Sequence, residues 1–293
     1  MFRLDKAPQL PNYIYIHGYE CNLNITIKGH KITPKSTHQT IKPSTPENKP
    51  NKTPKMKLST TIIPTLALLL QPTQALVGIS WNVNNSSKAL QEIAFPMNKA
   101  NASHESGFYF AQQYNFKNQK DVGYTGLQPR PDTNSKQKLH AAFSSFIAGT
   151  TSTDPNCSDG ADGGAGVSCA IDIEGSYAHT YLLHVNNTAG TTWTGTLIDA
   201  VSGNETRVGS YTLPEGSGGI VGDQMGFVEY YPWNAAGGHS CRDLPRSAVT
   251  FGKPVSPGRV GALKDAYEYG DCVGQVGFET HRTLRGVEVS VGF

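Results

Sequence analysis

The segment GVEVSVGF at residues 286–293 alternates apolar and polar residues with a period of two. Val287, Val289 and Val291 would share one face of a strand, and Glu288 and Ser290 the other. Short segments of this kind, rich in aromatic and β-branched residues, recur from residue 107 onward, with Gly, Pro, Asn, Asp and Ser between them. This pattern predicts an all-β fold, an antiparallel β-sandwich of jelly-roll or lectin-like type.

The segments expected to be strands are 107–116, 122–128, 140–149, 169–175, 180–185, 191–200, 207–213, 225–231, 248–252, 274–280 and 286–293. The one segment with a helical pattern is 87–100, which Pro96 would interrupt. No repeat and no linker divides this part of the chain, which predicts a single domain.

An internal secretory signal is predicted at residues 56–75, MKLSTTIIPTLALLLQPTQA. It has a start methionine, a basic residue, an apolar stretch too short to cross a bilayer, and a small-x-small cleavage site ending at Ala75. The predicted mature protein, 76–293, is therefore secreted and extracellular, with no membrane contact after cleavage. Residues 1–55 are polar, basic and Pro-rich, which indicates disorder. They represent either an over-extended start or a basic leader such as a transit peptide.

The charge changes sign between the two parts. The whole chain is +2, whereas residues 1–75 hold ten basic and three acidic residues and the remainder is acidic at −5. An acidic secreted domain argues against nucleic acid as a partner.

Four of the five cysteines follow residue 75, an even number that predicts two disulfides. Three pairings are possible, and the sequence-local one, Cys157–Cys169 with Cys241–Cys272, is preferred. A metal site is disfavoured because no C-x-x-C motif accompanies them. N-glycosylation sequons mark expected surface positions at Asn84, Asn85, Asn101, Asn186 and Asn204, while Asn156 is disfavoured because Cys157 is its middle residue.

No common catalytic motif is present. Asp172 and Glu174 lie two apart in an expected strand, so both carboxylates share one face, as glycoside hydrolysis would need. The competing interpretation is a solvated strand face. His179 and His184 are five apart and would face opposite sides, so they are expected to be structural.

Oxygen-bearing side chains gather in the loop DPNCSDGADGGAG. They resemble calcium ligands, but their spacing departs from that of an EF-hand. A turn tied by the disulfide is therefore the preferred interpretation. No cofactor is predicted, and calcium is the alternative. The residues concerned are Asp154, Asn156, Asp159 and Asp162.

Aromatic and polar residues alternate closely in EYYPWNAAGGHS at 229–240. Aromatic faces stack on sugar rings, and nearby polar groups bind hydroxyls. The segment predicts a ligand site; the alternative is that its aromatics fill the core. The proposed ligand-binding residues are Glu229, Tyr230, Tyr231, Trp233 and Asn234.

The order of features from Phe108 to Gly219 resembles a family of secreted proteins known as domain of unknown function 3472. The resemblance rests on YTGLQ at 124–128, Phe143-Ser144, the Gly-rich turn at 163–166 and the segment TWTGTLID at 192–199. Ala165 departs from the acid-containing turn of that family. The resemblance implies a secreted sandwich associated with polysaccharides, with no catalytic residues to carry over.

Three functions follow as hypotheses. The first is a secreted, non-catalytic glycoprotein that binds a polysaccharide or cell wall. The second is a glycoside hydrolase or polysaccharide lyase that uses Asp172 and Glu174. The third is a structural or host-interaction glycoprotein that binds a protein. The absence of a reaction motif favours the non-catalytic classes, although a sandwich can assemble a site from distant strands.

Overall fold

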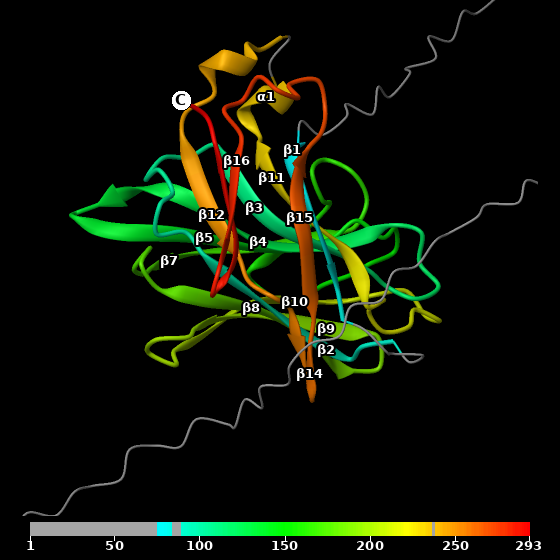
Figure 1. The fold of residues 1–293 in the computed structure, drawn as a ribbon. Coiled ribbons are helices and arrows are strands. Elements are labelled where there is room, and N and C mark those ends of the chain that lie inside the picture. Colours follow the sequence, from blue (N-terminus) through cyan, green and yellow to red (C-terminus); the bar gives the residue numbers. More distant parts are fainter. Residues whose placement is uncertain (1–74, 84–88, 236–237) are drawn as a thin grey trace, which may run out of the picture. The chain divides into compact units, whose positions relative to one another are not determined.

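The structure is a computed structural model, and it describes residues 75–83, 89–235 and 238–293 (Figure 1). Every described residue lies in one compact unit, Leu66–Phe293. The predictions for residues 1–74, which cover the leader and nearly all of the signal peptide, lie outside the described residues, as do Asn84 and Asn85.

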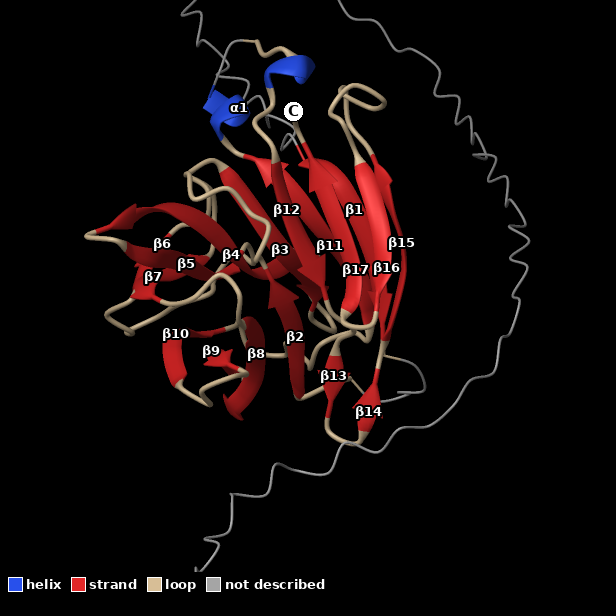
Figure 2. Cartoon of the chain, turned by 60° about the vertical axis from the view of Figure 1, so that its left-hand side comes forward, coloured by secondary structure: helices blue, strands red, loops and turns tan. Residues whose placement is uncertain are grey.

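Two antiparallel sheets form a β-sandwich, as the sequence predicted (Figure 2). The first sheet has eight strands in the order β15-β1-β11-β3-β4-β5-β7-β6. Their bounds, in chain order, are β1 Ala75–Asn82, β3 Phe108–Asn115, β4 Val122–Thr133, β5 Lys136–Ser145, β6 Cys157–Asp159, β7 Val167–Glu174, β11 Asp223–Tyr230 and β15 Ala262–Glu268.

The second sheet has the main order β10-β9-β8-β2-β12-β17-β16, and the short strands β13 and β14 pair beside β2. Their bounds are β2 Glu92–Asn98, β8 Thr180–Ala189, β9 Thr192–Asp199, β10 Glu205–Thr212, β12 Ser247–Phe251, β13 Val255–Ser256, β14 Arg259–Val260, β16 Glu279–Thr283 and β17 Gly286–Val291.

Helical structure among the described residues is limited to two short pieces, α1 Pro232–Ala235 and the 3₁₀ turn η1 Cys241–Asp243. Within the described ranges, neither piece has the length and apolar character needed to cross a bilayer.

One large apolar cluster fills the space between the sheets. Val287, Val289 and Val291 of β17 all belong to it, which confirms the side assigned to them from the alternation. Trp81 of β1 and Trp193 of β9 are each 1% exposed and enter the cluster from the two sheets. Burial of such large aromatic surfaces is the main stabilising contribution to a sandwich of this size.

The helix expected at 87–100 is wrong, because the described part of this segment forms strand β2. Pro96 is tolerated there for a local reason. On one side β2 pairs continuously with β8, but on the other its partner changes from β12 at Met97 to β13 at Ala94. Pro96 lies in the gap between these partners, where a missing N–H breaks no ladder hydrogen bond.

The expected strand at 274–280 is mostly wrong, because β16 begins only at Glu279. Both expected disulfides are confirmed. Cys157–Cys169 joins two directly paired residues of β6 and β7, and Cys241–Cys272 ties η1 to the segment between β15 and β16.

Candidate functional site

The eight-stranded sheet has a second face, turned away from the apolar core. On β3, Phe108 and Phe110 point into the core, whereas Tyr109 and Ala111 belong to a smaller cluster on the opposite face. The alternation of a strand requires this division. The outer face carries a groove of about 440 Å³, a volume in the range of small-molecule binding sites.

A row of small residues crosses the sheet beneath the groove, and two of them, Ala142 and Ala170, line it, whereas Gly126 lies under the Tyr109 ring. In strand order from β3 to β7 the paired residues are Ala111, Gly126, Ala142 and Ala170. A Cβ atom on Gly126 would lie 2.3 Å from the Phe110 carbonyl oxygen, so no larger residue fits there without movement of the backbone. We call these four residues the floor row.

Two parallel rows of larger residues flank the floor row. The Glu229 row crosses from β1 to β5 and consists of Ala75, Glu229, Tyr109, Gln128 and His140, while Asp172, the β7 partner of His140, lies outside the groove. The Gln113 row lies on the other side, and consists of Gln113, Tyr124, Ser144 and Ser168. The site is therefore a trough that runs across the strands, with polar and aromatic walls.

Glu229 of β11 is the most deeply buried acid in this trough, at 7% exposed. Its Oε1 accepts a hydrogen bond of 2.7 Å from Nδ2 of Asn234, which lies in α1 just beyond the end of β11. Burial raises the pKa of Glu229, the Asn234 hydrogen bond opposes that rise, and the negative charge of Asp162 adds to it. The carboxyl group is therefore able to exchange a proton under mildly acidic conditions.

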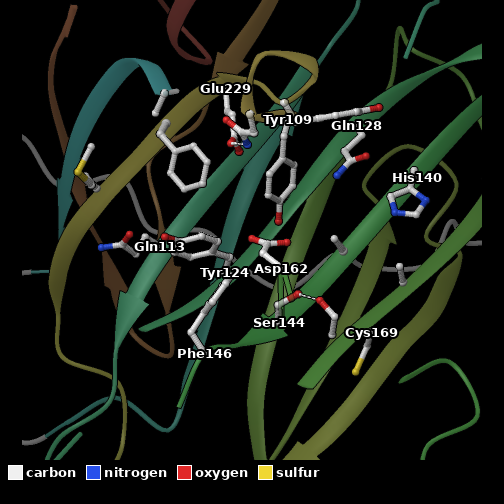
Figure 3. Close-up of a pocket in the computed structure, with 18 of the residues that line it drawn as sticks. Tyr109, Gln113, Tyr124, Gln128, His140, Ser144, Phe146, Asp162, Cys169 and Glu229 are labelled. Carbon is white, nitrogen blue, oxygen red and sulfur yellow. Dashed lines mark hydrogen bonds between the residues drawn. The ribbon is translucent and has the colours of Figure 1, made fainter. Parts of the chain in front are cut away.

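Asp162 is the second carboxyl group of the trough. It lies on the Gly-rich hairpin between β6 and β7, in the left-handed region with φ of 49°. In Figure 3 the Tyr109 side chain points toward this carboxylate, which lies between Tyr124 and Ser144. Although the residue is exposed overall, partial burial of its carboxyl group raises the pKa of Asp162.

Two tyrosines of the walls, Tyr109 and Tyr124, keep their hydroxyl protons. Burial raises the pKa of Tyr109 well above its ordinary value, and the charges of Asp162 and Glu229 add to the rise. Burial is also the main reason that the pKa of Tyr124 rises to about 12. Both hydroxyl groups can therefore donate hydrogen bonds into the trough throughout the acidic and neutral range.

The Gln128 amide has a fixed orientation. Its Oε1 accepts a hydrogen bond of 2.8 Å from Nη2 of Arg130, two residues further along β4 on the same face. Because the oxygen is engaged by the guanidinium, the amide NH₂ group is the end left for a ligand. Gln128 and His140 are directly paired on β4 and β5 and appear beside each other in Figure 3.

The two acids proposed from the sequence lie on the outer face but do not form a pair. The Asp172 carboxylate accepts a 2.8 Å hydrogen bond from Nδ1 of His140, and Glu174 forms ion pairs with Lys136 and Lys138 at 2.7 and 3.1 Å. Neither acid is among the residues that line the trough. Their arrangement matches the solvated, ion-paired strand face that was the competing interpretation.

The aromatic segment is divided by the structure. Glu229, Tyr231 and Asn234 line the trough. Tyr230 and Trp233 instead pack against the apolar core, and Trp233 stacks on the His239 ring with centroids 4.1 Å apart.

The four proposed calcium ligands are also dispersed. Asp154 forms an ion pair with Arg207 at 2.6 Å, and its Oδ1 accepts a hydrogen bond from the backbone N–H of Asn156. Asp159 is exposed, and Asp162 lines the trough. The loop thus forms a disulfide-tied turn, and the role of these residues toward calcium stays a prediction.

The structure gathers His239, Cys241 and Cys272, with their ligand atoms within 4.8 Å of one another. Sequence spacing gave no sign of this group, because His239 and Cys272 come from separate segments. Both sulfur atoms are used in the disulfide, and His239 Nε2 lies 3.4 Å from Cys272 Sγ. His179 and His184 bond to separate partners, Asp199 and Glu92, as expected of structural histidines.

Of the sequons in the described residues, Asn101 and Asn204 are exposed and Asn186 is half-buried. Residues that sequence analysis missed in the trough include Tyr109, Gln113, Arg130 and His140. The one usable signal was YTGLQ, which contains both the floor glycine Gly126 and the wall residue Gln128.

Comparisons with known proteins give only distant likenesses. No protein-family model and no curated protein matches the chain, so the resemblance expected for 108–219 has no support from a family model. Among solved structures, the chain is similar to scytalido-glutamic peptidase with a transition state analog inhibitor, at 14% identity and a TM-score of 0.42 over 75% of this chain and 99% of that one. It is also similar to SCP-B, a member of the eqolisin family of peptidases in complex with a tripeptide, at 13% identity and a TM-score of 0.38 with the same coverage. At this distance the likeness assigns no activity to the chain, whose fold is established by its own two antiparallel sheets and two disulfides.

Proposed function

We propose that the protein is a secreted hydrolase of peptide bonds, with Glu229 as its general base and general acid. The observation that supports this most directly is the position of Glu229. The residue is 7% exposed and lies on the wall of the trough, and its carboxyl group has a raised pKa. Those are the properties of a group that must both take up and release a proton during one reaction.

The reaction uses water as the nucleophile. The ionised Glu229 carboxylate takes a proton from a water molecule while the water oxygen bonds to the carbonyl carbon of the substrate. The carbonyl oxygen becomes an oxyanion, which the fixed NH₂ group of Gln128 stabilises. Glu229 then gives its proton to the amide nitrogen, the C–N bond breaks, and a carboxylic acid and an amine leave.

The shape of the trough supports an extended substrate. From β11 to β7 it crosses four interstrand spacings of about 4.8 Å, or about 19 Å in all, which matches about six residues of extended peptide. Ala142 and Ala170 of the floor row line the groove on β5 and β7, where their small side chains give it depth. Gln113, from the wall opposite Gln128, offers an amide donor and acceptor to the substrate backbone.

The test is an assay of the secreted protein, expressed from Met56, on an unfolded protein substrate between pH 3 and pH 7. We expect new amino termini to appear, and to be absent with Glu229→Gln. The matched control is Glu205→Gln, which changes an exposed acid on β10. Cleavage that survives in Glu229→Gln, or no cleavage by the native protein at any pH, would contradict the proposal.

A second candidate is glycan binding without catalysis, the first hypothesis drawn from the sequence. It is favoured by the aromatic walls, which include Tyr109, Tyr124, Tyr231 and Tyr269. Retention on insoluble chitin, β-glucan, cellulose or mannan that Tyr124→Ala abolishes, with no soluble product, would support it. Trp233→Ala serves as the contrast, since Trp233 packs against the core.

A further inference from the structure

Arg130 stands at the end of the trough wall, one step along β4 from Gln128 on the same face. Its Nη1 donates to the Pro129 carbonyl oxygen at 3.1 Å and to the Tyr231 hydroxyl at 3.4 Å, and its Nη2 donates to Gln128 Oε1 at 2.8 Å. All three acceptors are neutral. The guanidinium is therefore oriented by its neighbours without being neutralised by them.

The donors of Arg130 are only partly used. A guanidinium has five N–H groups, and three of them have partners in the described part of the chain. The Nε–H group and one hydrogen of Nη2 are left. These two nitrogens form one edge of the guanidinium, and such an edge binds a carboxylate through two parallel hydrogen bonds.

No carboxylate among the described residues occupies this edge as an ion-pair partner. The acid two residues along the same strand, Asp132, pairs with His104 at 2.9 Å instead. Arg130 is thus half-buried and held in place by neutral acceptors, with no ion-pair partner among the described residues, which leaves its charge available to an anionic ligand.

A second polar group lies beside Arg130. His140, on β5, lines the trough and uses Nδ1 for its 2.8 Å contact with Asp172, so Nε2 has no partner among the described residues. Arg130 and His140 are close enough that the guanidinium charge helps to lower the pKa of His140, after burial as the main cause. A carboxylate bound between the two groups would favour protonation of His140, and the imidazolium donates from Nε2 to the ligand as well as from Nδ1 to Asp172.

We propose that Arg130, assisted by His140, forms a carboxylate-binding subsite that selects peptides with an aspartate or glutamate side chain at one position in the trough. This subsite rests on the proposed peptide substrate, but it makes a binding contact and needs no turnover. The trough then has chemically different ends: the Glu229 carboxyl group toward β1 and β11, and a cationic recognition site toward β4 and β5.

The test measures binding in a Glu229→Gln background, so that no substrate is consumed. Six labelled hexapeptides carry one glutamate at successive positions in an alanine and serine frame, each matched by a peptide with glutamine there. At pH 6 the glutamate side chain is ionised. We expect one position at which glutamate binds at least 10-fold more tightly than glutamine, as fluorescence anisotropy would show.

Variants assign that preference to the subsite. Arg130→Gln is expected to abolish it, and Arg130→Lys, which keeps the charge but loses the fork, to reduce it. Arg282→Gln is the control, since Arg282 is exposed and pairs with Asp265. Circular dichroism checks that each variant folds, and with Arg130 intact in the Glu229→Gln background, binding of the selected peptide should raise the pKa of His140, measured by NMR.

The outcomes separate this inference from the proposed function. If the protein prefers glutamate through Arg130 but cleaves no substrate, the result supports the subsite and contradicts the proposal that the protein is a hydrolase. Equal binding of glutamate and glutamine at all six positions, or a preference that survives in Arg130→Gln, overturns the subsite even if the protein is a peptidase. Trigalacturonate, an oligosaccharide that carries carboxylates, is measured in the same assay. If it binds more tightly than any acidic peptide, the proposal that the subsite selects peptides is wrong.

Discussion

Arg130 donates a 2.8 Å hydrogen bond from Nη2 to Oε1 of Gln128, and so determines which end of the Gln128 amide faces the trough. The two residues are separated by one position in β4, so the alternation of the strand places them on the same face. A side-chain amide alone has two interchangeable orientations. The guanidinium, which can only donate, removes one of them.

Gln128→Leu tests the role of that amide in catalysis. Loss of one preorganised oxyanion donor typically lowers kcat by roughly 100- to 1,000-fold, and we expect a decrease of that order with little change in KM. The measurement is steady-state kinetics on a peptide that the native protein cleaves. Gln275→Leu, an exposed position, is the matched control. Unchanged kcat in Gln128→Leu would exclude this role.

The pH dependence of activity should respond to Asp162. As a general base Glu229 must be ionised, so kcat/KM rises with pH through its raised pKa. The charge of Asp162 is one cause of that elevation, so Asp162→Asn should lower the pKa of Glu229 and shift the rise in activity to lower pH. The measurement is the pH profile of kcat/KM. A shift to higher pH, or none, would show that the two groups do not interact as the structure indicates.

Glu229 should also affect stability. Its pKa is higher in the folded than in the unfolded protein, so on raising the pH the unfolded state loses its proton first and the folded state is relatively destabilised. That destabilisation is absent well below the unfolded pKa and complete above the folded pKa. Glu229→Gln should therefore raise the Tm at pH 7 and leave it nearly unchanged at pH 3. Glu205→Gln, measured in parallel, should show neither effect.

Lys99 gives a second prediction about stability, independent of the trough. It is fully buried, its Nζ has no hydrogen-bond partner among the described residues, and it lies 3.4 Å from the centre of the Tyr177 ring. Burial lowers its pKa to about 6, with the charge of Arg130 as a further cause.

Because the folded pKa of Lys99 is depressed, the unfolded state binds its proton first as the pH falls. As the pH falls from the unfolded-state pKa of 10.5 to the folded-state pKa of about 6, the free energy of unfolding decreases, and the decrease is complete below the folded-state pKa. Lys99→Met should therefore increase the free energy of unfolding at pH 5 by several kcal/mol, and much less at pH 10. Urea unfolding at both pH values would measure it, with Lys253→Met, an exposed lysine, as control.

Ala142→Leu tests the floor row. Ala142 is 9% exposed and faces the trough between Gly126 and Ala170. A leucine side chain would fill the floor, so an extended peptide should bind at least tenfold more weakly while the fold is kept. Ala189→Leu, at the exposed end of β8, is the comparison. Equal peptide affinities in the two variants would show that substrates do not lie over this row.

Much of the fold was predictable from local pattern. Alternation identified β17, and aromatic and β-branched segments between turn residues identified most of the other strands, since a pleated half-buried surface requires that composition. The prediction for 87–100 was wrong because its pattern was interpreted as a helix interrupted by Pro96, whereas Glu92–Asn98 form strand β2. The tolerance of Pro96 in β2 depends on where two other strands, β12 and β13, end beside it.

The candidate site was less predictable. Glu229, Tyr231 and Asn234 were found because they are neighbours in sequence, but Tyr230 and Trp233 came from the same segment and pack into the core. Strand alternation predicts that Tyr230 and Glu229 lie on opposite faces of β11. It could not show which of the two faces of the eight-stranded sheet packs against the second sheet.

The sequence by itself determined the class of fold, because that depends on local composition and spacing, and it favoured the pairing of the cysteines that the structure shows. Export of the protein stays a prediction. Only the tertiary structure decided which residues meet in the trough. Glu229, Gln128, Arg130 and His140 come from β11, β4 and β5, and they converge because cross-strand register, which is set by long-range pairing, aligns them in adjacent rows. The burial that raises the pKa of Glu229 arises from the same long-range packing.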